Sequence, residues 1–271
     1  AKKYGLIKGK IITTFHGYDA HFDPTNLKQG REFYNDLFKI TNYITVNTPY
    51  LGGQVLKLGC PTGKLRYVPM GVDFEGFRQT PKTTTDPIIF ISIGRLISLK
   101  GHRFGIEAIN ILVKKGYNVQ YTIIGDGPEK DNLSTLIQKH NLQNHVLLAG
   151  SKTQSEVKKY LSHSHIFLMT STYDIDGRAE TQGVVTIEAQ AFGLPIVAFR
   201  TGGVPYTIKE NVTGFTVNDK DINSFSEKCE ELIINKQFWL GEKKRKEIRN
   251  WARANYSLEI TNQQFMALYE K

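Results

Sequence analysis

Residues 88–127 read IIFISIGRLISLKGHRFGIEAINILVKKGYNVQYTIIGDG and contain one complete strand–helix–strand pattern. The runs at 88–93 and 120–124 are rich in β-branched residues and lack a regular polar alternation, which is typical of strands covered on both faces. Residues 102–115, between them, carry apolar side chains at helical spacing. Strand, helix and strand in this order predict two parallel strands joined by a right-handed crossover.

The same alternation continues toward the C-terminus. The sequence predicts further strands at 146–149, 166–170, 196–199 and 215–217, and further helices at 129–140, 155–162, 184–192 and 222–235. Regular alternation of this kind is the pattern of a doubly wound α/β domain with a parallel sheet. We therefore expect an α/β fold from residue 86 to residue 256.

The first 85 residues resemble half of a second domain of the same kind. They predict strands at 10–15, 43–46 and 65–68 and helices at 32–39 and 51–58. Three strands are few for a doubly wound sheet, so we expect the first strands of this domain to be missing.

Two further segments complete the predicted organisation. Residues 78–87, with two prolines and four threonines, predict a linker. The segment 257–271 is expected to form a helix that packs back on the partial domain 1–85.

Composition and charge restrict the classes of partner. The 271 residues are 40% apolar, enough to bury the cores of two domains, and the formal net charge of +9 favours an anionic partner. The basic run Lys243–Lys246 lies in a helical stretch without interleaved aromatic residues, so it is interpreted as a solvated helix face. With no nucleic-acid-binding motif in the sequence, nucleic acid is not expected as a partner.

Location and redox state follow from simpler observations. The sequence has no stretch of roughly 18 apolar residues that could span a bilayer. The first residues lack the apolar stretch of a secretory signal, so the cytoplasm is the expected compartment. Cys60 and Cys229 are too few for a disulfide framework and are expected to be free thiols.

Candidate functional residues follow the strands, because ligands of open α/β sheets bind beyond the carboxyl ends of the strands. Gly94-Arg95 and Lys100-Gly101 come after the strand at 88–93. An arginine fork and a lysine point charge in one glycine-containing loop suit a diphosphate. An ordinary solvated loop is the alternative interpretation.

The second candidate segment is ETQGVVTIE at 180–188. Gly183 permits a tight turn into a helix, and the amides of Val184 and Val185 would be unpaired donors at a helix start that binds phosphate. Glu188, among apolar neighbours, needs a partner such as a ribose diol, and Glu180 could bind sugar hydroxyls. Alternatively, both are surface glutamates near a helix start.

The run ETQGVVTIEAQAFGLPIVAFRTGG at 180–203 resembles the signature of retaining GT-B glycosyltransferases of family 4, in which seven residues separate two glutamates. FHGYD at 15–19, PMGVD at 69–73, the loop at 94–101 and IGDGP at 124–128 match the same family in order. Members that act in colanic acid and similar surface-polysaccharide assembly are the most similar. Thr181 departs from the glycine that commonly follows the first glutamate.

The resemblance implies two Rossmann-like domains that face a cleft, the first of them incomplete here. It also implies a role for each matching position: Arg95 and Lys100 at the distal phosphate, Glu188 at the ribose, Glu180 at the sugar, and His16, with Asp19 nearby, at the reacting carbon. The implied catalytic residues are His16, Arg95, Lys100 and Glu180. The implied donor-binding residues are Gly94, Arg95, Lys100, Gly150, Ser151, Lys152, Glu180, Gly183, Val184, Val185 and Glu188.

The implied reaction moves a hexose from a UDP or GDP sugar to a glycan or lipid-linked acceptor, with retention of configuration and without a metal or another cofactor. Contact with the inner face of an anionic membrane is a further expectation. Two alternatives share the fold: a catalytically silent nucleotide-sugar-binding module, and a sugar-nucleotide epimerase or hydrolase. Asp174 with Asp176, and His163 with His165, are interpreted as structural rather than metal-binding.

Overall fold

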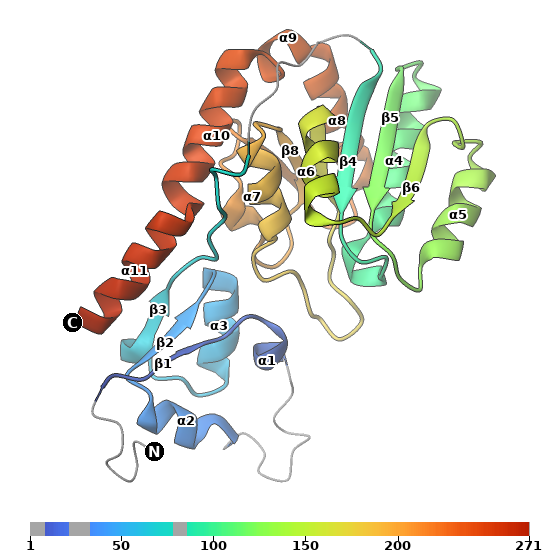
Figure 1. Ribbon diagram of the computed structural model, residues 1–271. Helices are drawn as coiled ribbons and strands as arrows, with labels where there is room; N and C mark the ends of the chain where they lie inside the picture. Colours follow the sequence, from blue (N-terminus) through green and yellow to red (C-terminus); the bar gives the residue numbers. More distant parts are fainter. Residues whose placement is uncertain (1–8, 22–32, 78–85, 271) are drawn as a thin grey trace. The chain divides into compact units, whose positions relative to one another are not determined.

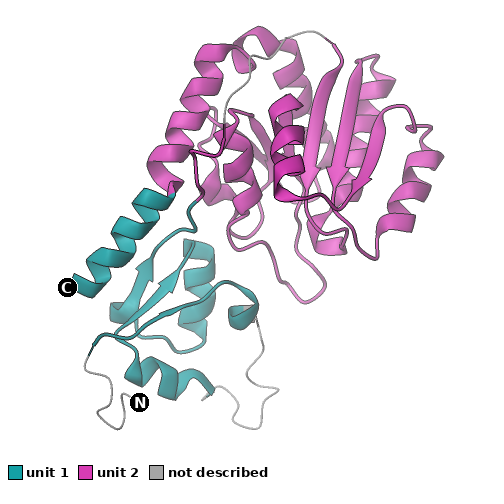
Figure 2. Ribbon diagram, in the orientation of Figure 1, with its two compact units in different colours: residues 1–71, 258–271 teal, residues 72–257 magenta. Residues whose placement is uncertain are grey.

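The computed structural model describes residues 9–21, 33–77 and 86–270. The chain divides into two compact units: unit 1 comprises residues 1–71 and 258–271, and unit 2 comprises residues 72–257 (Figure 2). Of the predicted linker, residues 78–85 lie outside the described residues. Each unit is considered by itself below.

Unit 2 is an α/β unit built on one sheet (Figure 1). Its strands are β4 (Ile88–Ile93), β5 (Val119–Ile124), β6 (Val146–Gly150), β7 (Ile166–Met169), β8 (Ile196–Phe199) and β9 (Gly214–Val217). Its helices are α4 (His102–Lys114), α5 (Lys130–Lys139), α6 (Gln154–His163), α7 (Val184–Ala191), α8 (Ile222–Ile234), α9 (Lys236–Trp239) and α10 (Glu242–Tyr256), with the 3₁₀ turns η5 (Ser98–Lys100) and η6 (Val204–Thr207).

The six strands are parallel and lie in the order β6-β5-β4-β7-β8-β9. Chain order therefore runs outward from β4 in one direction and resumes at β7 on the other side of β4. This is the doubly wound arrangement, and its switch point lies between β4 and β7. The fold class predicted from the sequence is confirmed.

The strands supply two hydrophobic cores, one on each face of the sheet. In β4, Ile88 and Phe90 join the core that contains α4, α5 and α8, whereas Ile91 joins the core that contains α7 and α10. The same alternation occurs in β7, where Leu168 and Phe167 belong to different cores. Burial on both faces explains why the strands read as continuous apolar runs.

Unit 1 contains a smaller sheet in which β1 (Ile12–Thr14), β2 (Tyr43–Val46) and β3 (Leu65–Tyr67) pair in parallel. Its other elements are α1 (Tyr18–His21), α2 (Asn35–Ile40), α3 (Pro49–Lys57), η4 (Thr62–Lys64) and α11 (Leu258–Glu270). The hydroxyl of Thr48 accepts a hydrogen bond from the Leu51 amide at 3.3 Å and, with Pro49 at the first position, fixes the start of α3.

The units and the predicted domains differ by one residue at the second boundary, where unit 2 ends at Ser257, and by more at the first. The units divide after Gly71, whereas the sequence suggested a first domain as far as residue 85. The side chains of Val72, Phe74 and Phe77 are buried in the core beside α10. The Val72 amide also donates to the Tyr256 carbonyl at 2.8 Å, so this segment belongs to unit 2.

Helix α11 is assigned to unit 1. Within that unit, the Thr261 hydroxyl donates to the Pro69 carbonyl at 3.1 Å, and the Lys10 ammonium donates to the Tyr269 carbonyl at 3.0 Å. Among the described residues, no helix combines the length and the apolar character that a membrane crossing requires.

Candidate functional site

The loop after β4 carries the two predicted cations. The Gly94 amide donates to the Ile124 carbonyl at 2.9 Å, which holds the beginning of the loop beside β5. Gly101, at the other end, has a φ of +59°, and a Cβ there would lie 2.2 Å from the Thr170 carbonyl oxygen. Only glycine allows this approach of the β4 loop to the end of β7.

Lys100 is positioned through both its backbone and its side chain. The Thr170 hydroxyl donates to the Lys100 carbonyl at 2.9 Å. The aliphatic stem of Lys100 lies against the space that a Cβ at Gly94 would occupy, 3.3 Å from the nearest stem atom. Arg95, by contrast, is exposed and forms no ion pair within the described part of the chain.

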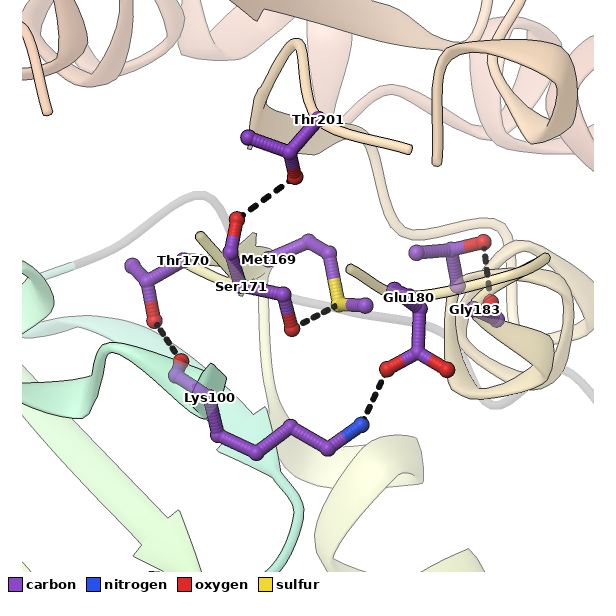
Figure 3. Close-up of polar contacts among 8 residues, drawn as sticks. Lys100, Met169, Thr170, Ser171, Glu180, Gly183 and Thr201 are labelled. Atoms are coloured by element: carbon purple, nitrogen blue, oxygen red, sulfur yellow. Dashed lines mark hydrogen bonds and ion pairs between the residues drawn. The ribbon is translucent and has the colours of Figure 1, made fainter. Parts of the chain in front are cut away.

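Glu180 lies opposite Lys100, and the two side chains form an ion pair between Lys100 Nζ and Glu180 Oε2 (Figure 3). Only 19% of the lysine side chain and 20% of the glutamate side chain is exposed. The structure thus brings together two residues that are 80 positions apart in the sequence.

The backbone of Glu180 is held by a glycine pair. The Gly203 amide donates to the Glu180 carbonyl at 2.7 Å, and a Cβ at Gly202 would lie 2.3 Å from the same oxygen. The Gly202 amide also donates to the Tyr173 hydroxyl at 3.2 Å. The turn after β8 therefore fixes the position of the Glu180 backbone at the carboxyl edge of the sheet.

Helix α7 begins beside Glu180. Gly183 precedes it with a φ of +76°, and its first-turn residues Val184 and Val185 are half-buried. The Thr186 hydroxyl donates to the Gly183 carbonyl at 2.7 Å. Amides at such a helix start favour an anionic ligand.

Glu188 lies in the second turn of α7 and is half-buried. It forms no ion pair within residues 9–21, 33–77 and 86–270. Burial raises the pKa of the Glu188 carboxyl, and the positive charge of Lys158 on α6 opposes that rise only in part. A carboxylate in this position gains from a ligand that donates hydrogen bonds to it.

The loop after β6 contains the three positions expected to flank a base. Gly150 has a φ of +71°, and its carbonyl accepts from the Gly125 amide at 3.0 Å. Ser151 is exposed and Lys152 half-buried, and Thr153 then caps α6. The loop thus leaves the same carboxyl edge of the sheet as the loop after β4.

His16 lies in unit 1, directly after β1 and the buried Phe15. Its amide donates to the Asp19 carboxylate at 3.1 Å, and the same carboxylate accepts from the Gly17 and Ala20 amides. Asp19 therefore organises the turn that carries His16. The predicted donor-binding residues all lie in unit 2.

The aspartates and histidines that the sequence analysis interpreted as structural rather than metal-binding have partners within the chain. Asp174 pairs with Arg178 Nε at 2.7 Å, and Asp176 pairs with the same guanidinium at 3.0 Å. His165 Nδ1 accepts from the Ile89 amide at 2.9 Å. Within the described segments, no group of three or more His, Cys, Asp and Glu residues could hold a metal ion.

Sequence reasoning missed the residues that support the site. Thr170, Ser171 and Thr201 are buried, and the Thr201 hydroxyl donates to the Ser171 carbonyl at 2.7 Å (Figure 3). A signal was present, since three consecutive hydroxyl residues after a fully buried strand must find internal partners.

His102 was also missed. It begins α4 under the loop after β4, is 4% exposed, and burial lowers the pKa of its ring to about 4 although the backbone at Gly94 and Arg95 favours the protonated form. A cavity of about 300 Å³ lies against the same loop, and residues 97–98, 101–104 and 172–175 contribute to its lining. It contains none of the predicted site residues.

Comparison with known proteins gives a family match. Residues 73–255 match the family described as Glycosyl transferases group 1. The chain is 32% identical over 235 residues to WcaL of Escherichia coli (strain K12), a protein assigned to colanic acid biosynthesis as a glycosyltransferase, covering 84% of this chain and 56% of WcaL. It is also 32% identical over 222 residues to the amylovoran biosynthesis glycosyltransferase AmsK of Erwinia amylovora, covering 82% of this chain and 54% of AmsK.

Solved structures show the same fold. Anabaena HepE in complex with UDP superimposes with a TM-score of 0.81 at 18% identity, covering 96% of this chain and 71% of HepE. The predicted GT-B fold is therefore confirmed. The chain spans about half the length of the curated relatives named above. On the family match and these identities, the chain belongs to the family of group 1 glycosyltransferases.

Proposed function

We propose that this chain binds a nucleoside-diphosphate sugar and, in the whole protein, transfers the sugar to a glycan or lipid-linked acceptor during surface-polysaccharide synthesis. The observation that carries the proposal is the convergence of Lys100, Glu180 and the start of α7 at the switch point of the sheet. A cation, a carboxylate and free amide donors at one place suit a diphosphate joined to a polyhydroxyl ring.

In this proposal each group has one task. Arg95 and Lys100 hold the distal phosphate, and the amides of Val184 and Val185 contact the diphosphate. Glu180 accepts hydrogen bonds from the transferred sugar, through the carboxylate oxygen that does not face Lys100. Glu188 accepts from the two ribose hydroxyls, which compensates its half-buried carboxylate.

Gly150, Ser151 and Lys152 flank the base, which is uracil or guanine. The HepE structure contains UDP, and its shared fold supports a donor with uracil as the base.

The proposed chemistry follows from charge. When the bond between the anomeric carbon and the phosphate oxygen breaks, the electron pair stays on the diphosphate and the sugar becomes cationic. Two basic side chains and a helix start stabilise this leaving group, and removal of one such donor typically costs about a hundred- to a thousandfold in rate. We assign this stabilisation to the protein rather than to a metal, so that transfer should survive chelation.

Retention of configuration and a contribution of His16 to the reacting carbon are parts of the same proposal and derive from the family resemblance. The expected setting is the cytoplasmic face of a membrane that presents the acceptor.

The test is the affinity for nucleoside diphosphates measured by calorimetry. Arg95→Ala should weaken binding of the preferred one of UDP and GDP about tenfold or more, because a charge-assisted bond to phosphate is lost. Arg103→Ala is the matched control, since Arg103 is equally basic, lies just after the same loop and pairs with Glu107. Unchanged affinity in Arg95→Ala would overturn the phosphate assignment.

Activity separates the remaining alternatives. Incubation with a panel of sugar nucleotides and candidate acceptors should yield a glycoside. Release of free sugar or an epimerised nucleotide sugar would favour a hydrolase or an epimerase. Binding without any turnover, in a protein extended to the full length of its relatives, would identify a silent binding module.

A further inference from the structure

Lys100 and Glu180 pair directly, ammonium to carboxylate. The Lys100 backbone is held by Thr170 and the Glu180 backbone by Gly203, so both side chains start from fixed points of the chain. With about four-fifths of each side chain buried, the pair is also poorly screened by water. A phosphate that approaches Lys100 therefore meets a fixed carboxylate at the same ammonium group.

The charge of that phosphate changes during the reaction. In the donor, the distal phosphate is esterified on both sides and carries one negative charge. After the bond to the sugar breaks, the phosphate keeps the electron pair and becomes a terminal group, which carries nearly two charges above its second pKa of about 6. The product thus places more negative charge beside Glu180 than the substrate does.

We infer that Glu180 selects against the free nucleoside diphosphate and so promotes release of this product; the inference rests on the proposed function. In the donor complex, the sugar hydroxyls donate to the Glu180 carboxylate and compensate its charge. In the product complex those hydroxyls are gone, and the carboxylate faces the terminal phosphate across one shared ammonium. The attraction of Lys100 is then divided between two anions.

Other charged groups around this position do not reverse the effect. Arg95 lies in the same loop as Lys100 and attracts both substrate and product. His102, packed beneath that loop, is neutral above about pH 4. Glu188 lies in the second turn of α7, and the positive charge of Lys158 acts on its carboxyl. Asp174 and Asp176 are already paired with Arg178.

The experiment measures the affinities of UDP and GDP, and of their β-methyl esters, for this chain and its Glu180→Gln variant. The methyl ester carries the charge of the donor without its sugar. At about pH 8 the variant should bind the preferred free diphosphate about tenfold more tightly, and its methyl ester with a much smaller gain. At about pH 5, where the terminal phosphate has lost its second charge, the gain for the free diphosphate should fall to that of its methyl ester.

Two variants serve as controls. Glu180→Asp keeps the negative charge and should retain weak binding of the free diphosphate. Glu188→Gln removes the other carboxylate and should weaken binding of diphosphate and ester equally, because both ligands carry the same ribose. An improvement in Glu188→Gln equal to that in Glu180→Gln would show only a general change of net charge and would overturn the inference.

The outcomes separate the inference from the proposed function. If the unaltered chain binds a diphosphate but Glu180→Gln binds it no better at about pH 8, selection by Glu180 is wrong and the donor site stands. If the unaltered chain binds neither UDP nor GDP nor any sugar nucleotide, the proposed function itself fails.

Discussion

The loops after β4 and after β7 meet at the same point of the sheet but are held in different ways. The first, residues 94–101, depends on glycines that let backbone approach backbone. The second, residues 170–183, depends on buried hydroxyls and on the glycine turn after β8. The position of Lys100 therefore depends on the close approach of its own loop to neighbouring backbone. The position of Glu180 depends instead on the turn after β8.

The largest loss of activity is expected from a substitution at Gly203, in the turn after β8 that contacts the loop carrying Glu180. A Cβ in Gly203→Ala would lie 1.8 Å from the Thr181 carbonyl oxygen, so the loop that carries Glu180 must move. We expect sugar transfer to fall by about a hundredfold, because displacement of a positioning group by about 1 Å is enough for such a loss.

The measurement is the turnover of the full-length protein with its preferred donor. Gly53→Ala is the matched glycine control, since a Cβ there meets nothing within 4 Å. Activity in Gly203→Ala close to that of the control would mean that the turn does not position Glu180.

A second substitution tests the backbone fit of the first loop. Gly101→Ala combines a φ of +59° with a Cβ 2.2 Å from the Thr170 carbonyl oxygen, and we expect it to lower the free energy of unfolding by about 3 kcal/mol. Gly177→Ala has the same kind of backbone, with a φ of +72°, but open space around the Cβ, and should cost about 1 kcal/mol. Urea denaturation of both variants measures the difference, and equal losses would remove close approach as the reason for Gly101.

The residue beneath the first loop makes stability depend on pH. The His102 ring has a pKa of about 4 in the folded chain, against 6.5 for a free ring, so the unfolded chain binds more protons between these values. Stability should therefore fall as the pH is lowered from 6.5 to 4, by up to about 3 kcal/mol from this group. Urea denaturation across this range should show a weaker pH dependence in His102→Gln, and an identical dependence would contradict the assignment.

The smallest effects should come from single hydroxyls, and they compare the two loops directly. Thr201→Val removes a fully buried bond to the Ser171 carbonyl and should cost about 2 kcal/mol. Thr170→Val removes a less buried bond to the Lys100 carbonyl and should cost about 1 kcal/mol. Thermal or urea denaturation measures both, and a larger loss in Thr170→Val would reverse the proposed difference between the loops.

Much of the fold could be predicted because its signals are local. Strand β4 occupies the predicted residues, and β8 does too, since each is a short apolar run covered on both faces. Strand β7 ends at Met169, one residue earlier than predicted, and the Thr170 hydroxyl that follows donates to the Lys100 carbonyl. The final helix α11 begins at Leu258, one residue after the predicted start at 257.

The sequence predicted those residues of the site that lie directly after a strand or before a helix. Arg95, Lys100 and Glu180 each follow a strand or precede a helix, so their common edge could be inferred. The contact between Lys100 and Glu180 could not, because it depends on how residues far apart in sequence approach. Gly202 and Gly203 were recognised as part of a signature, but the sequence alone does not reveal that they hold the backbone of Glu180.

Unit 1 is assembled from two separated parts of the chain, since α11 joins residues that precede unit 2. During synthesis the ribosome delivers every residue of unit 2, up to Ser257, before it delivers helix α11 of unit 1. Because domains fold as they emerge, unit 2 has the opportunity to fold first, while the early strands of unit 1 are still without α11. The connectivity of the chain thus favours folding of unit 2 before unit 1.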